Sequence, residues 1–209
     1  ADEFVQLMTP VVKAFMTDCG TEVASLGVQV YGGHGYIHEY GMEQYMRDAR
    51  IAQIYEGTNG VQALDLVGRK IPTATGRYLR RFFHPVYGYI QEKQGDAFLA
   101  EFVGPLQKAF ERLQQATITL AQRGLSNPDE IGAAASDYLR LIALTAHAYL
   151  WTKACEVAYK KKTGQESAFY ESKIATARFF MQKILPQTSS LFACIMSGSK
   201  PLMEMKEEA

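Results

Sequence analysis

The sequence predicts an all-α fold, a helical bundle, on two observations. Apolar residues recur at intervals of three and four through most of the 209 residues. Alternating apolar and polar runs, which are typical of strands, are missing. With 47% hydrophobic residues and seven prolines, the chain is long and apolar enough to bury one sizeable core or two small ones, which excludes a disordered protein.

The first helix is expected from the Thr9–Pro10 pair to Tyr31. Threonine can cap a helix, and proline is favoured at the first helical position because its missing N–H has no partner there. The apolar stripe consists of Val12, Phe15, Met16, Cys19, Val23, Leu26 and Val30. Three glycines then fall within residues 32–35, which predicts a loop over Gly32–Tyr36.

Shorter elements follow this loop. We expect a helix over 42–47, a second loop over Tyr55–Gly60, and a helix over 61–69 that is terminated by residues 71–73, Ile-Pro-Thr. Beyond this point the glycine-rich loops cease and long amphipathic runs begin. We therefore predict two domains, residues 1–71 and residues 72–209. In the second we expect helices near 76–93, 96–122, 128–162, 166–184 and 187–197.

Composition excludes several classes of function. The 22 basic and 22 acidic residues balance, and Lys160–Lys162 is the only basic run of three, so we expect no nucleic-acid partner. The run is better explained as a solvated helix end. No apolar segment is long enough to span a membrane. His34 and His38 flank a glycine loop without a third ligand, so no metal site is predicted.

The cysteines and the first residues bear on location and completeness. Cys19, Cys155 and Cys194 are odd in number and far apart, which predicts buried thiols in a reducing, cytoplasmic setting. The chain starts at Ala1 without a signal sequence, and we expect it to be a piece of a longer protein. His147 is expected to be a hydrogen-bonded core histidine.

Two loops are candidate functional sites. The first, residues 29–36, places backbone N–H groups at a helix end, which suits a phosphate or the edge of a cofactor. Its glycines could instead only let two helices approach closely. The second holds Glu56 behind the apolar Ile54 and Tyr55, where burial would raise the carboxyl pKa and favour a general base. The alternative is a solvent-facing acid.

Segment 29–62 resembles the C-terminal helical domain of the acyl-CoA dehydrogenases. Three elements occur in the family's order and spacing, and they are Gln29-Val30-Tyr31-Gly32-Gly33, Arg47-Asp48-Ala49-Arg50-Ile51 and Ile54-Tyr55-Glu56-Gly57-Thr58. The clear resemblance covers residues 9–70. The remainder is similar to the helical extension of some large bacterial members.

The resemblance implies a chemistry. Glu56 takes the α-proton of an acyl-CoA thioester while the β-hydride passes to FAD, which gives a trans-2-enoyl-CoA. The Glu56 backbone N–H helps to polarise the thioester carbonyl, and Gly57 contacts the substrate. FAD contacts are implied for Thr58 within one subunit and, from the neighbouring subunit, for Gln29, Val30, Tyr31, Gly32 and Gly33.

One departure from the family pattern, and the charged residues of its second element, carry further expectations. Gly60 stands where many members have glutamine, and Asn59 is the candidate to compensate for it in contacting FAD. Arg47, Asp48 and Arg50 are expected to form ion pairs that hold the loop before Glu56.

The resemblance also implies partners. They are an acyl-CoA substrate, an electron-transfer flavoprotein as acceptor, and copies of the same chain in a homodimer or homotetramer. The alternative is a non-catalytic, dehydrogenase-like protein whose extension binds nucleic acid or serves oligomerisation. Zero net charge and the retained Glu56 disfavour nucleic-acid binding.

Overall fold

The computed structural model describes residues 1–164 and 166–205. Every regular element in this part of the chain is a helix, so the all-α prediction is confirmed. The elements are α1 (Asp2–Tyr31), α2 (Gly33–Tyr36), the 3-10 turn η1 (His38–Tyr40), α3 (Met42–Ile51), α4 (Asn59–Asp65), the π-turn η2 (Leu66–Lys70), α5 (Thr73–Lys93), α6 (Ala100–Ser126), α7 (Asp129–Lys161), α8 (Ser167–Phe179), the π-turn η3 (Phe180–Ile184), α9 (Gln187–Ser197) and α10 (Lys200–Met203).

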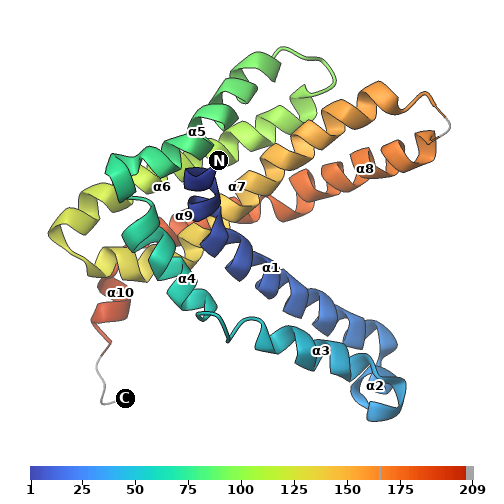
Figure 1. Ribbon diagram of the computed structural model, residues 1–209, viewed down its shortest axis with the longest axis horizontal. Helices are drawn as coiled ribbons and strands as arrows, with labels where there is room; N and C mark the ends of the chain where they lie inside the picture. Colours follow the sequence, from blue (N-terminus) through green and yellow to red (C-terminus); the bar gives the residue numbers. More distant parts are fainter. Residues whose placement is uncertain (165, 206–209) are drawn as a thin grey trace.

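Helix α7 is the centre of the bundle. It packs against α6, α8 and α9 on its sides and receives α4 and η2 near its first half. Residues 141–146 are buried without interruption, which requires neighbours all around the helix rather than along one stripe. Figure 1 shows α5, α6, α7 and α8 extending in a common direction.

The first half of helix α1 packs in the bundle, and its second half extends away from it. Its buried residues all precede Met16, where it packs on α7. Its second half leaves the bundle with α3 beside it and α2 at the tip (Figure 1). Helix α3 buries no residue within the described chain. We call residues 17–51 the arm; the large apolar side chains exposed along it include Val23, Leu26, Val30, Tyr31, Tyr36, Tyr45 and Ile51.

Helix boundaries differ from the sequence expectations at α1, α3 and α4. Helix α1 begins at Asp2 rather than at Thr9–Pro10, because Leu7 and Val11 are buried and tertiary packing holds the first turns. The Thr9 hydroxyl donates backward to the Val5 carbonyl at 2.7 Å instead of capping. Helix α3 runs to Ile51, and α4 starts at Asn59. The extension helices lie close to their expected ranges.

The three cysteines and His147 differ in how they are buried. The thiol of Cys155 is buried, which raises its pKa to about 11. Cys19 is half-buried, and the expectation for Cys194 was wrong, because α9 turns its neighbour Ile195 inward and leaves Cys194 exposed. His147 is confirmed as a packed histidine whose Nδ1 lies 2.9 Å from the Ala143 carbonyl oxygen. None of the described helices has the length and apolar character to cross a membrane.

Candidate functional site

The segment that joins α3 to α4 has an unusual backbone. Glu56 and Gly57 adopt successive left-handed conformations, with φ of 55° and 80°. A left-handed residue other than glycine is strained by about 1–3 kcal/mol and persists only when its surroundings hold it. Here Gln62 Nε2 donates to the Glu56 carbonyl at 2.9 Å. Glycine is favoured at 57 by its φ of 80°, and a Cβ there would also displace the Gln62 amide, which it would approach to 2.9 Å.

A polar clamp fixes this turn to α1. Lys13 Nζ donates to the Gly57 carbonyl at 2.7 Å and to Asn59 Oδ1 at 2.8 Å. Asn59 Nδ2 reaches the Ala14 carbonyl at 3.1 Å, Thr17 Oγ1 at 3.0 Å and Asp18 Oδ1 at 2.6 Å. The half-buried Asn59 side chain is thus bonded to α1, and its expected contact with FAD in place of residue 60 stays a prediction.

The Glu56 side chain itself is exposed, which corrects the expectation of a half-buried carboxylate. Ile54 and Tyr55 are 49% and 52% exposed, so they do not cover it. Among the described residues the Glu56 N–H has no hydrogen-bond partner. The turn therefore presents one free carboxylate and one free backbone N–H donor. Burial of the Glu56 carboxylate would require contact with a surface outside the described residues.

Thr58 follows directly and caps α4. Its Oγ1 accepts from the Val61 N–H at 3.4 Å, a long bond that leaves most of the hydroxyl's capacity free. This cap explains why α4 starts two residues earlier than expected.

The first candidate loop is only partly a loop. Gly32, at φ 61°, ends α1 as expected, but residues 33–36 form the single helical turn α2. At Gly35 a Cβ would lie 2.5 Å from the Val28 carbonyl oxygen, so this glycine does serve close packing. Gly32 and Gly33 face open space, and Val30 is 84% exposed. Gln29 and Tyr31 are also exposed.

The two candidate sites lie at opposite ends of the arm. Gly32 and Gly33 are at its tip, and the Glu56 turn is at its base, where the chain returns to the bundle through α4 (Figure 1).

Two family models cover most of the chain. A model described as "Acyl-CoA dehydrogenase, C-terminal domain" matches residues 2–71, and one described as "Acetyl-CoA dehydrogenase C-terminal like" matches residues 78–206. The chain belongs to the acyl-CoA dehydrogenase family.

Curated members of the acyl-CoA dehydrogenase family match along the same length. The 3-methylmercaptopropionyl-CoA dehydrogenase of Ruegeria pomeroyi is 36% identical over 91% of this chain and 33% of its own. The broad-specificity linear acyl-CoA dehydrogenase FadE5 of Mycobacterium tuberculosis is 30% identical over 97% of this chain and 35% of its own. The chain thus spans about a third of the length of these relatives.

A solved structure matches the fold. Caenorhabditis elegans ACDH-11, crystallised in complex with C11-CoA, superposes with a TM-score of 0.68 at 21% identity, over 87% of this chain and 29% of that one. The arrangement of helices is therefore that of the C-terminal part of an acyl-CoA dehydrogenase.

Within this family member, the residues before Glu56 do not act as expected. Arg47, Asp48 and Arg50 form no ion pair within the described chain, so that expectation was wrong. Asp48 accepts from Gln44 at 2.8 Å, and Arg50 donates to Gln53 at 2.5 Å. These partners lie only three or four residues away along the chain, where they are reached more easily than a distant charge.

The residues that do hold the Glu56 turn were missed. Lys13 and Asp18 come from the first helix, and Gln53 Nε2 donates to Asp18 Oδ1 at 2.6 Å. They are 35 to 46 residues from their partners, so no local spacing in the sequence indicates the contact. The one available signal was a run of polar residues, 17 and 18, on a helix otherwise read by its apolar stripe.

Each histidine of the arm contacts a different neighbouring side chain. His34 packs on the Tyr40 ring with centroids 4.7 Å apart, and His38 Nδ1 lies 3.3 Å from Glu43 Oε1. In the described ranges no three His, Cys, Asp or Glu side chains gather as metal ligands would.

Proposed function

We propose that this chain is the C-terminal part of an FAD-dependent acyl-CoA dehydrogenase and that Glu56 is the base that removes the substrate α-proton. The observation that carries the proposal is the strained turn at Glu56–Gly57, clamped to α1 and presenting a free carboxylate beside a free N–H. Strain held in place by surrounding contacts is typical of functional sites. Family membership supplies the reaction class.

Two groups of the turn act on the substrate. An α-proton next to a thioester is a weak acid, so its removal requires stabilisation of the enolate charge that develops on the carbonyl oxygen. The Glu56 N–H donates a hydrogen bond to that oxygen, and the Glu56 carboxylate accepts the proton. Gly57 follows Glu56 in the turn and contacts the substrate through its backbone. Bound FAD supplies the acceptor for the β-hydride.

The residues proposed to hold FAD fit a large ligand. Gln29, Val30, Tyr31, Gly32 and Gly33 are exposed at the arm tip, and the two glycines leave open space for a close approach. Thr58 has a hydroxyl with free capacity beside Glu56. Because tip and base lie at opposite ends of the arm (Figure 1), as the family resemblance also implies, we propose that the tip contacts the flavin of a second subunit and Thr58 that of its own. This implies a homodimer or homotetramer.

The remaining partners follow from the reaction class. The substrate is an acyl-CoA, as the names of the relatives support, and the electron acceptor is an electron-transfer flavoprotein. We further propose that residues 1–71 complete the catalytic domain and that residues 72–209 form an extension domain. Three free cysteines fit a reducing compartment such as the cytoplasm. The chain alone is expected to be inactive.

The test is Glu56→Gln in the complete enzyme, with Glu111→Gln, an exposed acid of the extension, as the matched control. General-base catalysis supplies roughly 10²- to 10⁴-fold, so flavin bleaching by substrate under anaerobic stopped flow should slow by that factor in Glu56→Gln alone. FAD content and acyl-CoA affinity should stay near normal. Bleaching at the parental rate would place the base elsewhere.

A further inference from the structure

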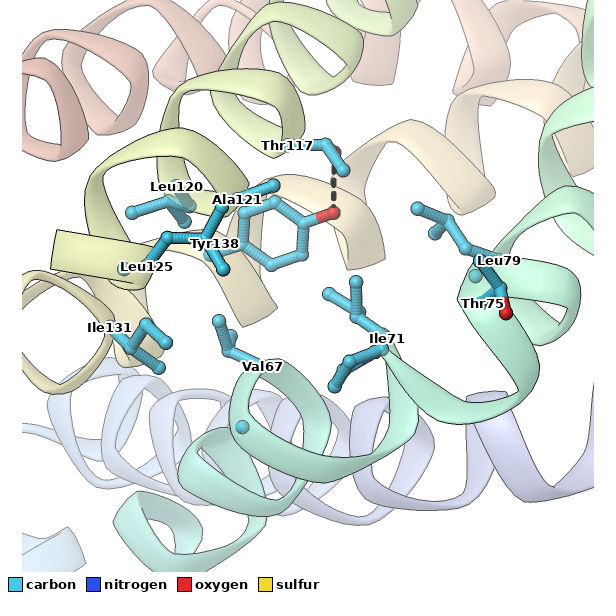
Figure 2. Close-up of a pocket in the computed structure, with 14 residues that line it drawn as sticks. Val67, Ile71, Thr75, Leu79, Thr117, Leu120, Ala121, Leu125, Ile131 and Tyr138 are labelled. Atoms are coloured by element: carbon cyan, nitrogen blue, oxygen red, sulfur yellow. Dashed lines mark hydrogen bonds between the residues drawn. The ribbon is translucent and has the colours of Figure 1, made fainter. Parts of the chain in front are cut away.

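A cavity lies beside η2, the segment that follows α4. It has a volume of about 490 Å³ and is enclosed by η2, the start of α5, the end of α6 and the start of α7. Figure 2 shows Val67 and Ile71 on one wall, with Leu120, Leu125 and Ile131 across from them. It shares no lining residue with the Glu56 turn, so the inference below does not rest on the proposed function.

Two backbone irregularities lie along the wall of this cavity. Gly68 lies in the π-turn η2, which widens the helix where it faces the cavity. Ala74, Thr75 and Gly76 are all left-handed, with φ of 50°, 57° and 75°, and they displace the first turn of α5 from the rest of that helix. Such conformations are unfavourable for residues other than glycine and persist only where surrounding structure supports them.

The chemistry of the wall is that of hydrocarbon. None of the described lining residues is Asp, Glu, Lys, Arg or His. The Tyr138 hydroxyl lies 2.7 Å from Thr117 Oγ1 (Figure 2). Thr117 Oγ1 in turn donates to the Leu113 carbonyl at 2.7 Å. These buried groups satisfy one another, so the floor offers no free polar partner. A polar group pushed into the cavity would lose its water contacts without replacement.

The mouth is open to solvent and can tolerate a polar head. Leu125 is 91% exposed at the rim, and Gly68 and Ala121 are exposed on facing walls. A cavity of this size is in the range of small-molecule sites, which run from roughly 300 to 1,000 Å³. An occupant with a hydrocarbon tail and one polar end matches both the floor and the mouth.

We propose that this cavity is a non-catalytic binding site for the alkyl chain of a fatty acid or of a fatty acyl thioester, with the polar head at the mouth. Affinity then grows with each methylene that enters, by roughly fourfold per methylene, until the cavity is full.

The test is calorimetric titration of the 209-residue chain with octanoate, decanoate and dodecanoate. Gly68→Met and Ala121→Met each place a side chain in the cavity from a different wall. A Cβ at Gly68 meets no atom within 4 Å, so the added side chain is tolerated. Gly88→Met is the matched control, at an exposed glycine of α5 with equally open surroundings.

We expect saturable one-to-one binding whose affinity increases with the length of the acid. The affinity should be at least tenfold weaker in both cavity variants and within twofold of the parent in Gly88→Met. Circular dichroism checks that each variant is folded, and either folded cavity variant suffices. Displacement of decanoate by decanoyl-CoA would identify the thioester as a source of the chain, and displacement by free acids alone would identify the fatty acid. The absence of saturable binding, or unchanged binding in a folded cavity variant, would overturn the proposal.

Discussion

Replacement of Asn59 by alanine should release the Glu56 turn. The Asn59 amide nitrogen has two hydrogens and so donates two of its three contacts to α1 at a time, while its oxygen accepts from Lys13. At about 1 kcal/mol net for each of three bonds, the loss is about 3 kcal/mol. The free energy that holds the turn against α1 should therefore decrease by this amount.

Amide hydrogen exchange of the 209-residue chain measures the effect locally. Gln62 N–H bonds to the Thr58 carbonyl at 3.0 Å, and its exchange should accelerate roughly a hundredfold in Asn59→Ala. The control is Gln44→Ala, which removes a single exposed bond to Asp48 and should change stability by less than about 0.5 kcal/mol. Exchange at Gln62 that matches the parent within threefold would refute the clamp as the support of the turn.

Three further outcomes follow from the described contacts. Gly57→Ala should lower the free energy of unfolding in urea by more than about 1 kcal/mol, because φ is 80° and the space is filled, whereas Gly60→Ala, which faces open space in α4, should be neutral or stabilising; equal effects would contradict the strain. Hydrogen bonds from Lys160 and Lys93 lower the pKa of Glu156 from 4.5 to about 2, so this contribution to stability is present above pH 4.5 and is lost as pH falls toward 2. The melting-temperature gap between the parent and Glu156→Gln should therefore narrow between pH 7 and pH 3, and a constant gap would contradict this. FAD should bind the isolated chain weakly or not at all in a fluorescence titration, because a dinucleotide needs an enclosed site and the arm is open; a tight one-to-one complex would contradict it.

The extension helices could be predicted from the sequence because their amphipathic pattern is long and their end signals are strong. Asn127–Pro128 precedes α7, and α9 spans the expected residues 187–197. Periodicity alone did not reveal that α1 begins at Asp2, since the buried Leu7 is stabilised by contacts with distant helices. The left-handed run at Ala74–Gly76 has no sequence signal beyond a single glycine.

At the candidate site the sequence indicated the position of the turn and not its environment. Glycine at 57 correctly marks a backbone that a side chain would disturb. The expected burial of Glu56 failed because neighbours along the chain, Ile54 and Tyr55, point into solvent instead of over the carboxylate. Burial depends on surfaces brought in from elsewhere, which local sequence does not encode. The Lys13 contact was missed for the same reason.

Exchange of the α-hydrogen tests the role of Glu56 most directly. An acyl-CoA without hydrogen on its β-carbon can lose and regain its α-proton but cannot transfer a hydride, so wash-out of an α-deuterium label in the complete enzyme reports proton removal alone. We predict that the parent exchanges the label readily and that Glu56→Gln exchanges it at least roughly a hundredfold more slowly, with the analogue bound equally well. Exchange in Glu56→Gln at the parental rate would contradict the assignment of Glu56 as the base.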